Sequence, residues 1–126
     1  PAVDPKNVRR ILMCTGKVYY DLLAERRATG RNDVAILRME QLYPLKTQHL
    51  EDLLAPYADG TDLVWVQEEP ENGGAWRWLR SRFCPKMLGR FPLRGVSRPA
   101  SASPATGSAN AHKIEQERLV KAAFAE

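Results

Sequence analysis

Hydrophobic positions along this chain of 126 residues fall into two patterns, short continuous runs and stripes with helical spacing. Mostly apolar runs cover Val8 to Cys14, Asp33 to Met39 and Leu63 to Gln67. Runs of this length and composition are typical of strands that are covered on both faces of a parallel sheet. The chain therefore has three predicted buried strands within its first 67 residues.

The segments between these runs have the period of a helix. Apolar residues at positions 18, 19, 22 and 23 form one stripe, and those at 50, 53, 54 and 57 form another. We expect the first helix to end near Gly30, which readily adopts the left-handed conformation of a helix C-terminus. We expect Thr47 to be the N-cap of the second helix and Pro56 to end it.

The remainder of the chain continues the alternation of helix and strand. A third helix is predicted after Gly73-Gly74, with Trp76 packed against the sheet, followed by a short strand at Leu93–Ser97. The small, hydroxyl-rich stretch Arg98–Ser108 is predicted to be a loop, and a last helix should begin near His112. Strands separated by helices predict right-handed crossovers, a mostly parallel sheet and an α/β fold.

Composition is consistent with one soluble α/β domain. The length suits a single core, and we interpret residues 1–7 as the tail of a linker and residues 8–126 as the domain. No apolar run approaches the roughly 20 residues of a membrane span, so we expect no membrane partner. The two cysteines have no metal-like spacing and are expected to be reduced. Because the chain starts at Pro1 instead of methionine, we expect it to be a piece of a longer protein.

The net charge of +4 comes largely from a basic run in the second half of the chain. Such a run could bind nucleic acid or an acidic partner, but it is also typical of a solvated helix face. We favour the solvated face and expect no nucleic-acid partner, because no nucleic-acid motif accompanies the run. Its members are Arg77, Arg80, Arg82, Lys86, Arg90, Arg94 and Arg98.

The junction Thr15-Gly16-Lys17 between the first strand and the first helix is the candidate anion-binding corner. A helix that starts at the carboxyl edge of a sheet directs free N–H groups outward, Thr15 could cap them, and Lys17 adds positive charge. The full phosphate-binding loop also requires a glycine where this chain has Ile11, so we do not predict a nucleotide hydrolase. The alternative is that Lys17 is solvated or pairs with Asp21 one turn later.

Other strand ends should meet the same edge of the sheet. Arg38, after the second strand, could add charge to a bound anion, and Gln67, after the third, could orient it. The acidic pair that follows Gln67 would oppose an anion, so we interpret it as part of an interface or as loop-fixing. The complete set given this second role is Glu68, Glu69, Asn72, Trp76 and Arg98.

Catalytic chemistry is not indicated within the chain. His49 and His112 each stand alone in a polar helix end, which favours solvent exposure over catalysis. The sequence contains no evident pair of nucleophile and base, no metal-ligand cluster and no cofactor fingerprint. We therefore expect this chain to have no enzymatic activity in isolation.

Four separated motifs together resemble one known family over nearly the whole chain, from about Val8 to Phe124. The family is the C-terminal domain of the thiamine-diphosphate-dependent component of 2-oxoglutarate dehydrogenase. The motifs are Cys14-Thr-Gly-Lys-Val-Tyr-Tyr-Asp-Leu22, Val34-Ala-Ile through Glu40-Gln-Leu-Tyr-Pro44, Trp65-Val-Gln-Glu-Glu-Pro70 with Asn72, Gly74 and Ala75, and Arg98-Pro-Ala-Ser-Ala-Ser-Pro-Ala-Thr-Gly107.

This resemblance implies a three-layer, transketolase-like C-terminal domain, with a twisted, mostly parallel sheet of about five strands and helices on both faces. It implies a homodimeric parent that decarboxylates 2-oxoglutarate on thiamine diphosphate and magnesium in the citric acid cycle. The parent then passes the succinyl group to a lipoyl-bearing succinyltransferase component. The cofactor and the catalytic histidines would belong to preceding domains, so no catalytic residue is assigned here.

Two functions remain open at this point. The first is a structural, regulatory and dimer-contacting domain of such a dehydrogenase, whose location would be the bacterial cytoplasm or the mitochondrial matrix. The second is a free-standing module that binds an anionic ligand, such as acetyl-CoA or a nucleotide. In some members of the family this domain takes part in binding an acyl-CoA or nucleotide regulator.

Overall fold

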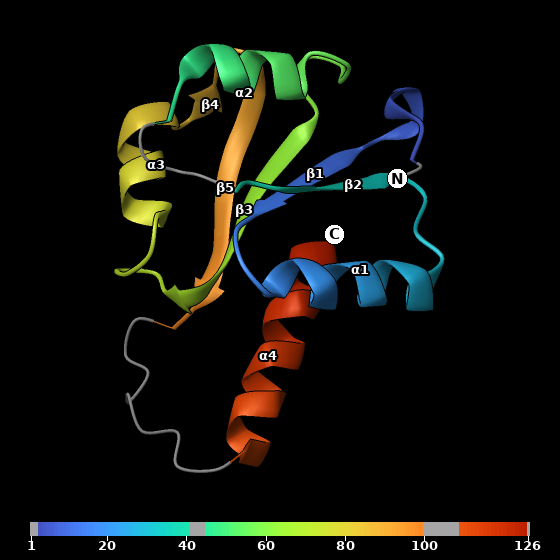
Figure 1. Ribbon diagram of the computed structural model, residues 1–126, viewed down its shortest axis with the longest axis vertical. Helices are drawn as coiled ribbons and strands as arrows, with labels where there is room; N and C mark the ends of the chain where they lie inside the picture. Colours follow the sequence, from blue (N-terminus) through green and yellow to red (C-terminus); the bar gives the residue numbers. More distant parts are fainter. Residues whose placement is uncertain (1–2, 41–44, 100–108, 126) are drawn as a thin grey trace.

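The computed structural model describes residues 3–40, 45–99 and 109–125, and within them strands and helices alternate as the sequence predicts (Figure 1). The described strands are β1 (Arg10–Cys14), β2 (Val34–Arg38), β3 (Asp62–Pro70), β4 (Lys86–Met87) and β5 (Phe91–Arg98). The described helices are the 3-10 turn η1 (Pro5–Asn7) and the α-helices α1 (Val18–Thr29), α2 (Thr47–Leu54), α3 (Trp76–Phe83) and α4 (Ala109–Phe124).

The described strands form one twisted sheet in the order β2-β1-β3-β5-β4. The pairs β1/β2, β1/β3 and β3/β5 are parallel, and only the short strand β4 runs antiparallel to its neighbour β5. Leu12 lies opposite Ile36 on one side and Val64 on the other, so β1 and β3 are interior strands of the sheet and β2 is one of its edges. The α/β fold with a mostly parallel five-stranded sheet is confirmed.

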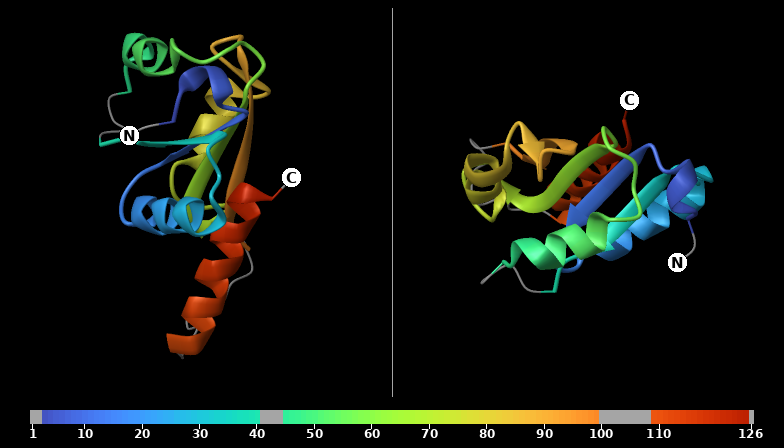
Figure 2. Two further views of the ribbon diagram at one scale, coloured as in Figure 1. Left: turned by 90° about the vertical axis from the view of Figure 1, so that its right-hand side faces the viewer. Right: turned by 90° about the horizontal axis from the view of Figure 1, so that it is seen from above.

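Helices cover both faces of the sheet, which gives the three layers visible in Figure 2. In β1, Ile11 and Met13 point to the face covered by α2 and α3, whereas Leu12 and Cys14 point to the face covered by α1 and α4. β3 alternates in the same way. The apolar run in each central strand is continuous because both of its faces are buried.

Local sequence signals determine where several elements begin and end. The prediction for Gly30 is confirmed: it has φ 66°, and its N–H donates to the carbonyls of Arg26 and Arg27 at the end of α1. The prediction that Thr47 is the N-cap of α2 is wrong by one residue. Lys46 occupies that position in extended conformation and makes no side-chain capping bond.

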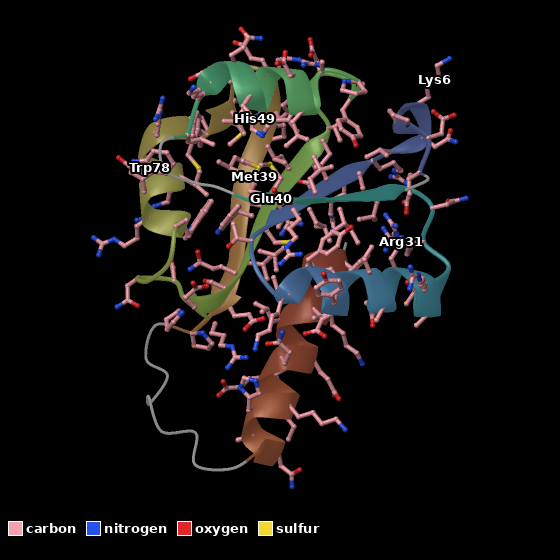
Figure 3. All side chains as sticks on the ribbon, in the orientation of Figure 1. Lys6, Arg31, Met39, Glu40, His49 and Trp78 are labelled. Atoms are coloured by element: carbon pink, nitrogen blue, oxygen red, sulfur yellow. The ribbon has the colours of Figure 1, made fainter. Side chains whose placement is uncertain are left out.

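Two arginines near the amino ends of β1 and β2 hold the last turn of α4. Arg10 donates to the carbonyls of Ala123 (3.1 Å) and Ala125 (2.7 Å), and Arg31 donates to the carbonyl of Phe124 (3.2 Å). These carbonyls have no partner within the helix and carry the negative end of its dipole. Two positive side chains therefore anchor the last turn of α4 to the sheet; Arg31 is labelled in Figure 3.

The described part of residues 1–7 is ordered against the domain. The Asp4 side chain accepts from the Lys6 N–H at 3.0 Å and caps η1, while Val3 packs against the core on the α2/α3 face. The proposed boundary between linker and domain stays a prediction.

The predicted apolar patch at 42–45 and loop at 98–108 lie mostly outside the described residues. None of the described helices has the length and apolarity needed to cross a membrane.

Candidate functional site

A hollow of about 430 Å³ lies at the carboxyl edge of the sheet, close to the ends of β1, β3 and β5. It brings together segments that are far apart in the sequence: the turn before α1, the end of β3, the end of β5 and the start of α4. The lining residues are Thr15, Gly16, Lys17, Glu68, Glu69, Arg98 and His112. Six of these seven are sequence-predicted site residues, and we refer to this hollow as the edge pocket.

The turn before α1 forms one wall of the edge pocket. Gly16 has φ 75°, a left-handed conformation that makes a tight turn possible between β1 and α1. The prediction that Thr15 caps α1 is wrong: Lys17 is at the N-cap position, and the helix has no side-chain capping bond. Because the turn delays the helix, Thr15 lies two positions before the N-cap, too early for its hydroxyl to cap.

Lys17 is exposed and forms no ion pair with any described residue. The alternative pairing with Asp21 is not observed. Asp21 instead accepts a hydrogen bond from Nε2 of Gln116 on α4, at 2.8 Å. The Lys17 ammonium is therefore free of a described carboxylate partner and borders the pocket.

Arg98 connects the opposite wall of the edge pocket to α4. Its guanidinium donates to Gln116 Oε1 (2.6 Å) and Glu115 Oε2 (3.2 Å), and Nη1 lies 3.4 Å from Nδ1 of His112. The side chain is only 12% exposed, and its Nε is buried without a hydrogen-bond partner among the described residues. Arg98 thus fixes the end of β5 to α4, and its expected role at an interface or in fixing a loop stays a prediction.

The α4 side of the pocket is what sequence reasoning missed. His112 was expected to be isolated; it is exposed, but it lines the pocket beside Arg98. Gln116 links three segments, since it accepts from Arg98 and its Nε2 contacts Asp21 and Glu68 (3.4 Å). No local pattern reveals these contacts, because they join residues of α4 to residues that are far away in the sequence.

Gln67 does not line the edge pocket. It is buried, and its Oε1 accepts from the Trp65 indole N–H (2.9 Å) and from the Trp76 backbone N–H (2.9 Å). Its Nε2 donates to the carbonyls of Pro70 (2.9 Å) and Gly73 (2.8 Å). The amide is fully used inside the protein, so it fixes the turn between β3 and α3 and is not presented to a ligand.

Arg38 also lies outside the set of residues that line the pocket. Its guanidinium carbon is 5.8 Å from the ring centroid of Tyr19 and 5.3 Å from that of Tyr20. Its Nη1 donates to the Tyr20 hydroxyl at 3.2 Å. Cation–π contacts with two rings therefore hold Arg38 on α1.

The remaining predicted residues are divided between core and surface. Trp76 is buried as predicted, and its indole lies directly over Gly95, where an added Cβ would come within 2.5 Å of Cε2. Asn72 is exposed in the turn before α3 and is not among the pocket-lining residues. Trp76 thus has a packing role in the loop-to-helix junction, whereas the structure gives no role to Asn72.

The chemistry available at the edge pocket is that of binding. Cys14 lies at the end of β1, but burial raises the pKa of its thiol to about 12, despite the opposing charge of Arg38. It is therefore a protonated, buried thiol at neutral pH. No group of three or more His, Cys, Asp or Glu among the described residues could hold a metal ion. Lys17 offers a positive charge to a ligand, opposed by Glu68 and Glu69.

Comparison with known proteins extends over the whole chain. The sequence profile of the family described as "2-oxoglutarate dehydrogenase C-terminal" matches residues 1–124. The 2-oxoglutarate dehydrogenase E1 component of Haemophilus influenzae is 49% identical over 122 residues, which cover 97% of this chain and 13% of that protein. The E1 component of Azotobacter vinelandii is 45% identical over 126 residues, which cover 98% and 13%.

A more distant relative carries a different name. The "probable 2-oxoadipate dehydrogenase complex component E1 homolog" of Dictyostelium discoideum is 38% identical over 121 residues, which cover 96% of this chain and 13% of that protein. The chain thus spans about an eighth of the length of the curated relatives it matches. With a profile match from end to end and close relatives of this kind, the chain belongs to the 2-oxoglutarate dehydrogenase C-terminal family.

Proposed function

We propose that this chain is the structural, regulatory and dimer-contacting C-terminal domain of a 2-oxoglutarate dehydrogenase E1 component. The observation that carries the proposal is the match over residues 1–124, supported by relatives that are named E1 components. The parent would decarboxylate 2-oxoglutarate and pass the succinyl group to a lipoyl-bearing succinyltransferase component. It would act in the citric acid cycle, as a homodimer, in the bacterial cytoplasm or the mitochondrial matrix.

Thiamine diphosphate and magnesium would supply the decarboxylation chemistry of the parent. Magnesium bound to a diphosphate needs oxygen ligands in near-octahedral arrangement. Among the described residues, no group of three or more His, Cys, Asp or Glu could hold a metal ion. In keeping with the family resemblance, we assign the binding of this cofactor to the rest of the parent chain and assign no catalytic step to this domain.

Steady-state assays of the full-length parent test this proposal. With thiamine diphosphate and magnesium, we expect 2-oxoglutarate-dependent reduction of ferricyanide by the full-length protein and none by residues 1–126 alone. A parent that ends before this segment should lose its dimeric mass in light scattering. Turnover by the segment alone, an unchanged dimer after its removal, or a parent active only on 2-oxoadipate would contradict the proposal.

The edge pocket favours a second function, which is binding of a phosphate-bearing ligand by this domain. Thr15, Gly16 and Lys17, predicted as an anion-binding corner, do lie together in one hollow. The start of α1 contributes the positive end of the helix dipole, although the N–H groups of Tyr19 and Tyr20 already donate to the carbonyls of Gly16 and Lys17. Lys17 brings a charge with no described ion-pair partner. The ligand would be an acyl-CoA or a nucleotide that regulates the parent.

Calorimetry distinguishes this second function from a solvated lysine. We expect acetyl-CoA or AMP to bind the full-length parent, and Lys17→Ala to weaken binding about tenfold, the effect of losing one charge-assisted hydrogen bond. Arg38→Ala is the matched control, because Arg38 is held by tyrosine rings outside the pocket. Equal affinity in wild type and Lys17→Ala, or no heat with either ligand, would eliminate this site.

A further inference from the structure

The second half of the chain contains a long segment without any acidic residue. Between Glu71 and Glu115 there is no Asp or Glu, yet the segment holds eight Lys and Arg residues. A solvated surface normally interleaves charges of both signs. The structure shows which of these basic residues are neutralised by carboxylates from other parts of the chain.

Most of the described ion pairs of this segment involve the arginines around β5. They form ion pairs with carboxylates from distant segments: Arg90 with Asp59, Arg94 with Asp62 (3.3 Å), and Arg98 with Glu115 (3.2 Å). The basic residues of α3 and β4 differ. Among the described residues, Arg77, Arg82 and Lys86 have no carboxylate within ion-pair distance, and Arg80 reaches only Glu71, at 3.8 Å with both side chains more than half exposed.

These four exposed residues lie within ten positions along α3 and β4, and we call them the α3 basic face: Arg77, Arg80, Arg82 and Lys86. α3 buries Trp76, Leu79 and Phe83 against the sheet, and its three arginines are exposed. Lys86 follows in β4 and is exposed. Figure 3 labels Trp78 on α3 and His49 on the neighbouring helix α2.

Arg82 is held in a fixed position on this face. Its guanidinium carbon lies 5.4 Å from the Trp78 ring centroid and 5.2 Å from that of Phe83. Its Nη2 lies 3.5 Å from the Thr47 hydroxyl at the start of α2. A guanidinium stacked in this way loses less conformational entropy when it binds a carboxylate than a freely moving one does.

We infer that the α3 basic face docks an acidic polypeptide segment. The face matches such a partner in charge, since it is a cluster of positive side chains that the described fold leaves almost unneutralised. Three of its members are arginines, whose planar donors suit carboxylates. A single-stranded nucleic acid is less suited, because base stacking needs open aromatic faces and Arg82 covers the ring of Trp78.

Fluorescence anisotropy on the full-length protein tests the inference, with a fluorescein-labelled decaglutamate as the probe. The test variant is Arg77→Glu/Lys86→Glu, because neither side chain has a hydrogen bond or ion pair to a described residue and folding should be preserved. We expect wild type to bind the probe at 50 mM salt, and the dissociation constant to rise at least about tenfold in this variant.

A matched control variant distinguishes an effect of the α3 basic face from an effect of the protein's net charge. Arg27→Glu/Lys113→Glu makes the same change in net charge on exposed positions of α1 and α4, which cover the other face of the sheet. We expect this control to change the dissociation constant less than about twofold. An equal loss in both variants, no binding by wild type, or tighter binding of a labelled ten-residue oligo-dT would each overturn the inference.

Discussion

At the scale of single residues, the buried side chain of Gln67 uses both its oxygen and its nitrogen in several hydrogen bonds. The buried amide of Gln67 accepts from two groups, the indole N–H of Trp65 and the backbone N–H of Trp76, and donates to three carbonyls at the end of β3 and in the following turn. A buried polar group left without its partner costs about 1–3 kcal/mol. The loop between β3 and α3 therefore depends on this side chain.

Replacing Gln67 by leucine should remove all of these hydrogen bonds while nearly keeping the volume. We expect Gln67→Leu to lower the free energy of unfolding in urea by at least about 3 kcal/mol, because several buried groups lose their partners. Gln48→Leu is the control: Gln48 is exposed and, among the described residues, bonds only to Asp52, so its loss should stay within about 0.5 kcal/mol. A similar, small loss in both variants would show that the loop does not need the amide.

The packing of Trp76 depends on Gly95, because the indole occupies the volume that a side chain at position 95 would need. Trp76→Ala should cost about 3–5 kcal/mol in unfolding free energy, as expected for a buried aromatic side chain. Gly95→Ala should cost about 1–3 kcal/mol through overpacking. The double variant should lose less than the sum of the single losses; strict additivity, or a loss below about 1 kcal/mol for Trp76→Ala, would contradict this packing.

At the scale of elements, the attachment of α4 depends on Arg98. Its bonds to Glu115 and Gln116 connect the end of β5 to the middle of the helix. We expect Arg98→Met to destabilise the chain by about 1.5–3 kcal/mol, since charge-assisted bonds of a mostly buried side chain are lost. Hydrogen exchange should show the largest loss of protection in α4.

Arg94→Met is the matched control for Arg98→Met. Arg94 lies on the same strand and pairs with Asp62, but its side chain is 44% exposed, so its loss should cost less than about 1 kcal/mol. If exchange in α4 is equally fast in both variants, Arg98 does not hold the helix.

Sequence periodicity predicted the long elements because each has a local cause. The continuous apolar runs of β1 to β3 reflect two covered faces, and Gly30 ends α1 through its own conformational freedom. β4 was not predicted, since two residues carry no period and its pairing with β5 is tertiary. The capping roles given to Thr15 and Thr47 were wrong because each turn places the helix start one or more residues away from the hydroxyl.

At the scale of the whole molecule, topology predicted where the candidate site lies but not all of its members. Carboxyl ends of parallel strands do meet at one edge, which brings Lys17, Glu68 and Arg98 together. Side-chain direction is decided by neighbours that the sequence does not reveal: tyrosine rings draw Arg38 onto α1, and buried carbonyls engage Gln67. His112 lines the site because α4 packs beside Arg98 at this edge of the sheet, which the sequence does not reveal.

The stability of the whole fold should fall at alkaline pH, and Cys14 is the main reason among the described groups. Burial raises the pKa of its thiol from about 9 to about 12, and burial also raises the pKa of Cys84 and Tyr57. Between these two pH values the unfolded chain loses the thiol proton while the folded chain keeps it. Unfolding is therefore favoured as pH rises, with a slope of about 1.4 kcal/mol per pH unit for one such group.

Urea unfolding at pH 7, 8, 9, 10 and 10.5 measures this slope. Below about pH 9 the thiol is protonated in both states and contributes no pH dependence. We expect Cys14→Ala to have a shallower decline than wild type above that pH, with the remainder due to Cys84 and Tyr57. Cys84→Ala should change the slope less, because this thiol is only half-buried. Parallel curves for wild type and Cys14→Ala would mean that the Cys14 thiol ionises as readily in the folded chain as in the unfolded one.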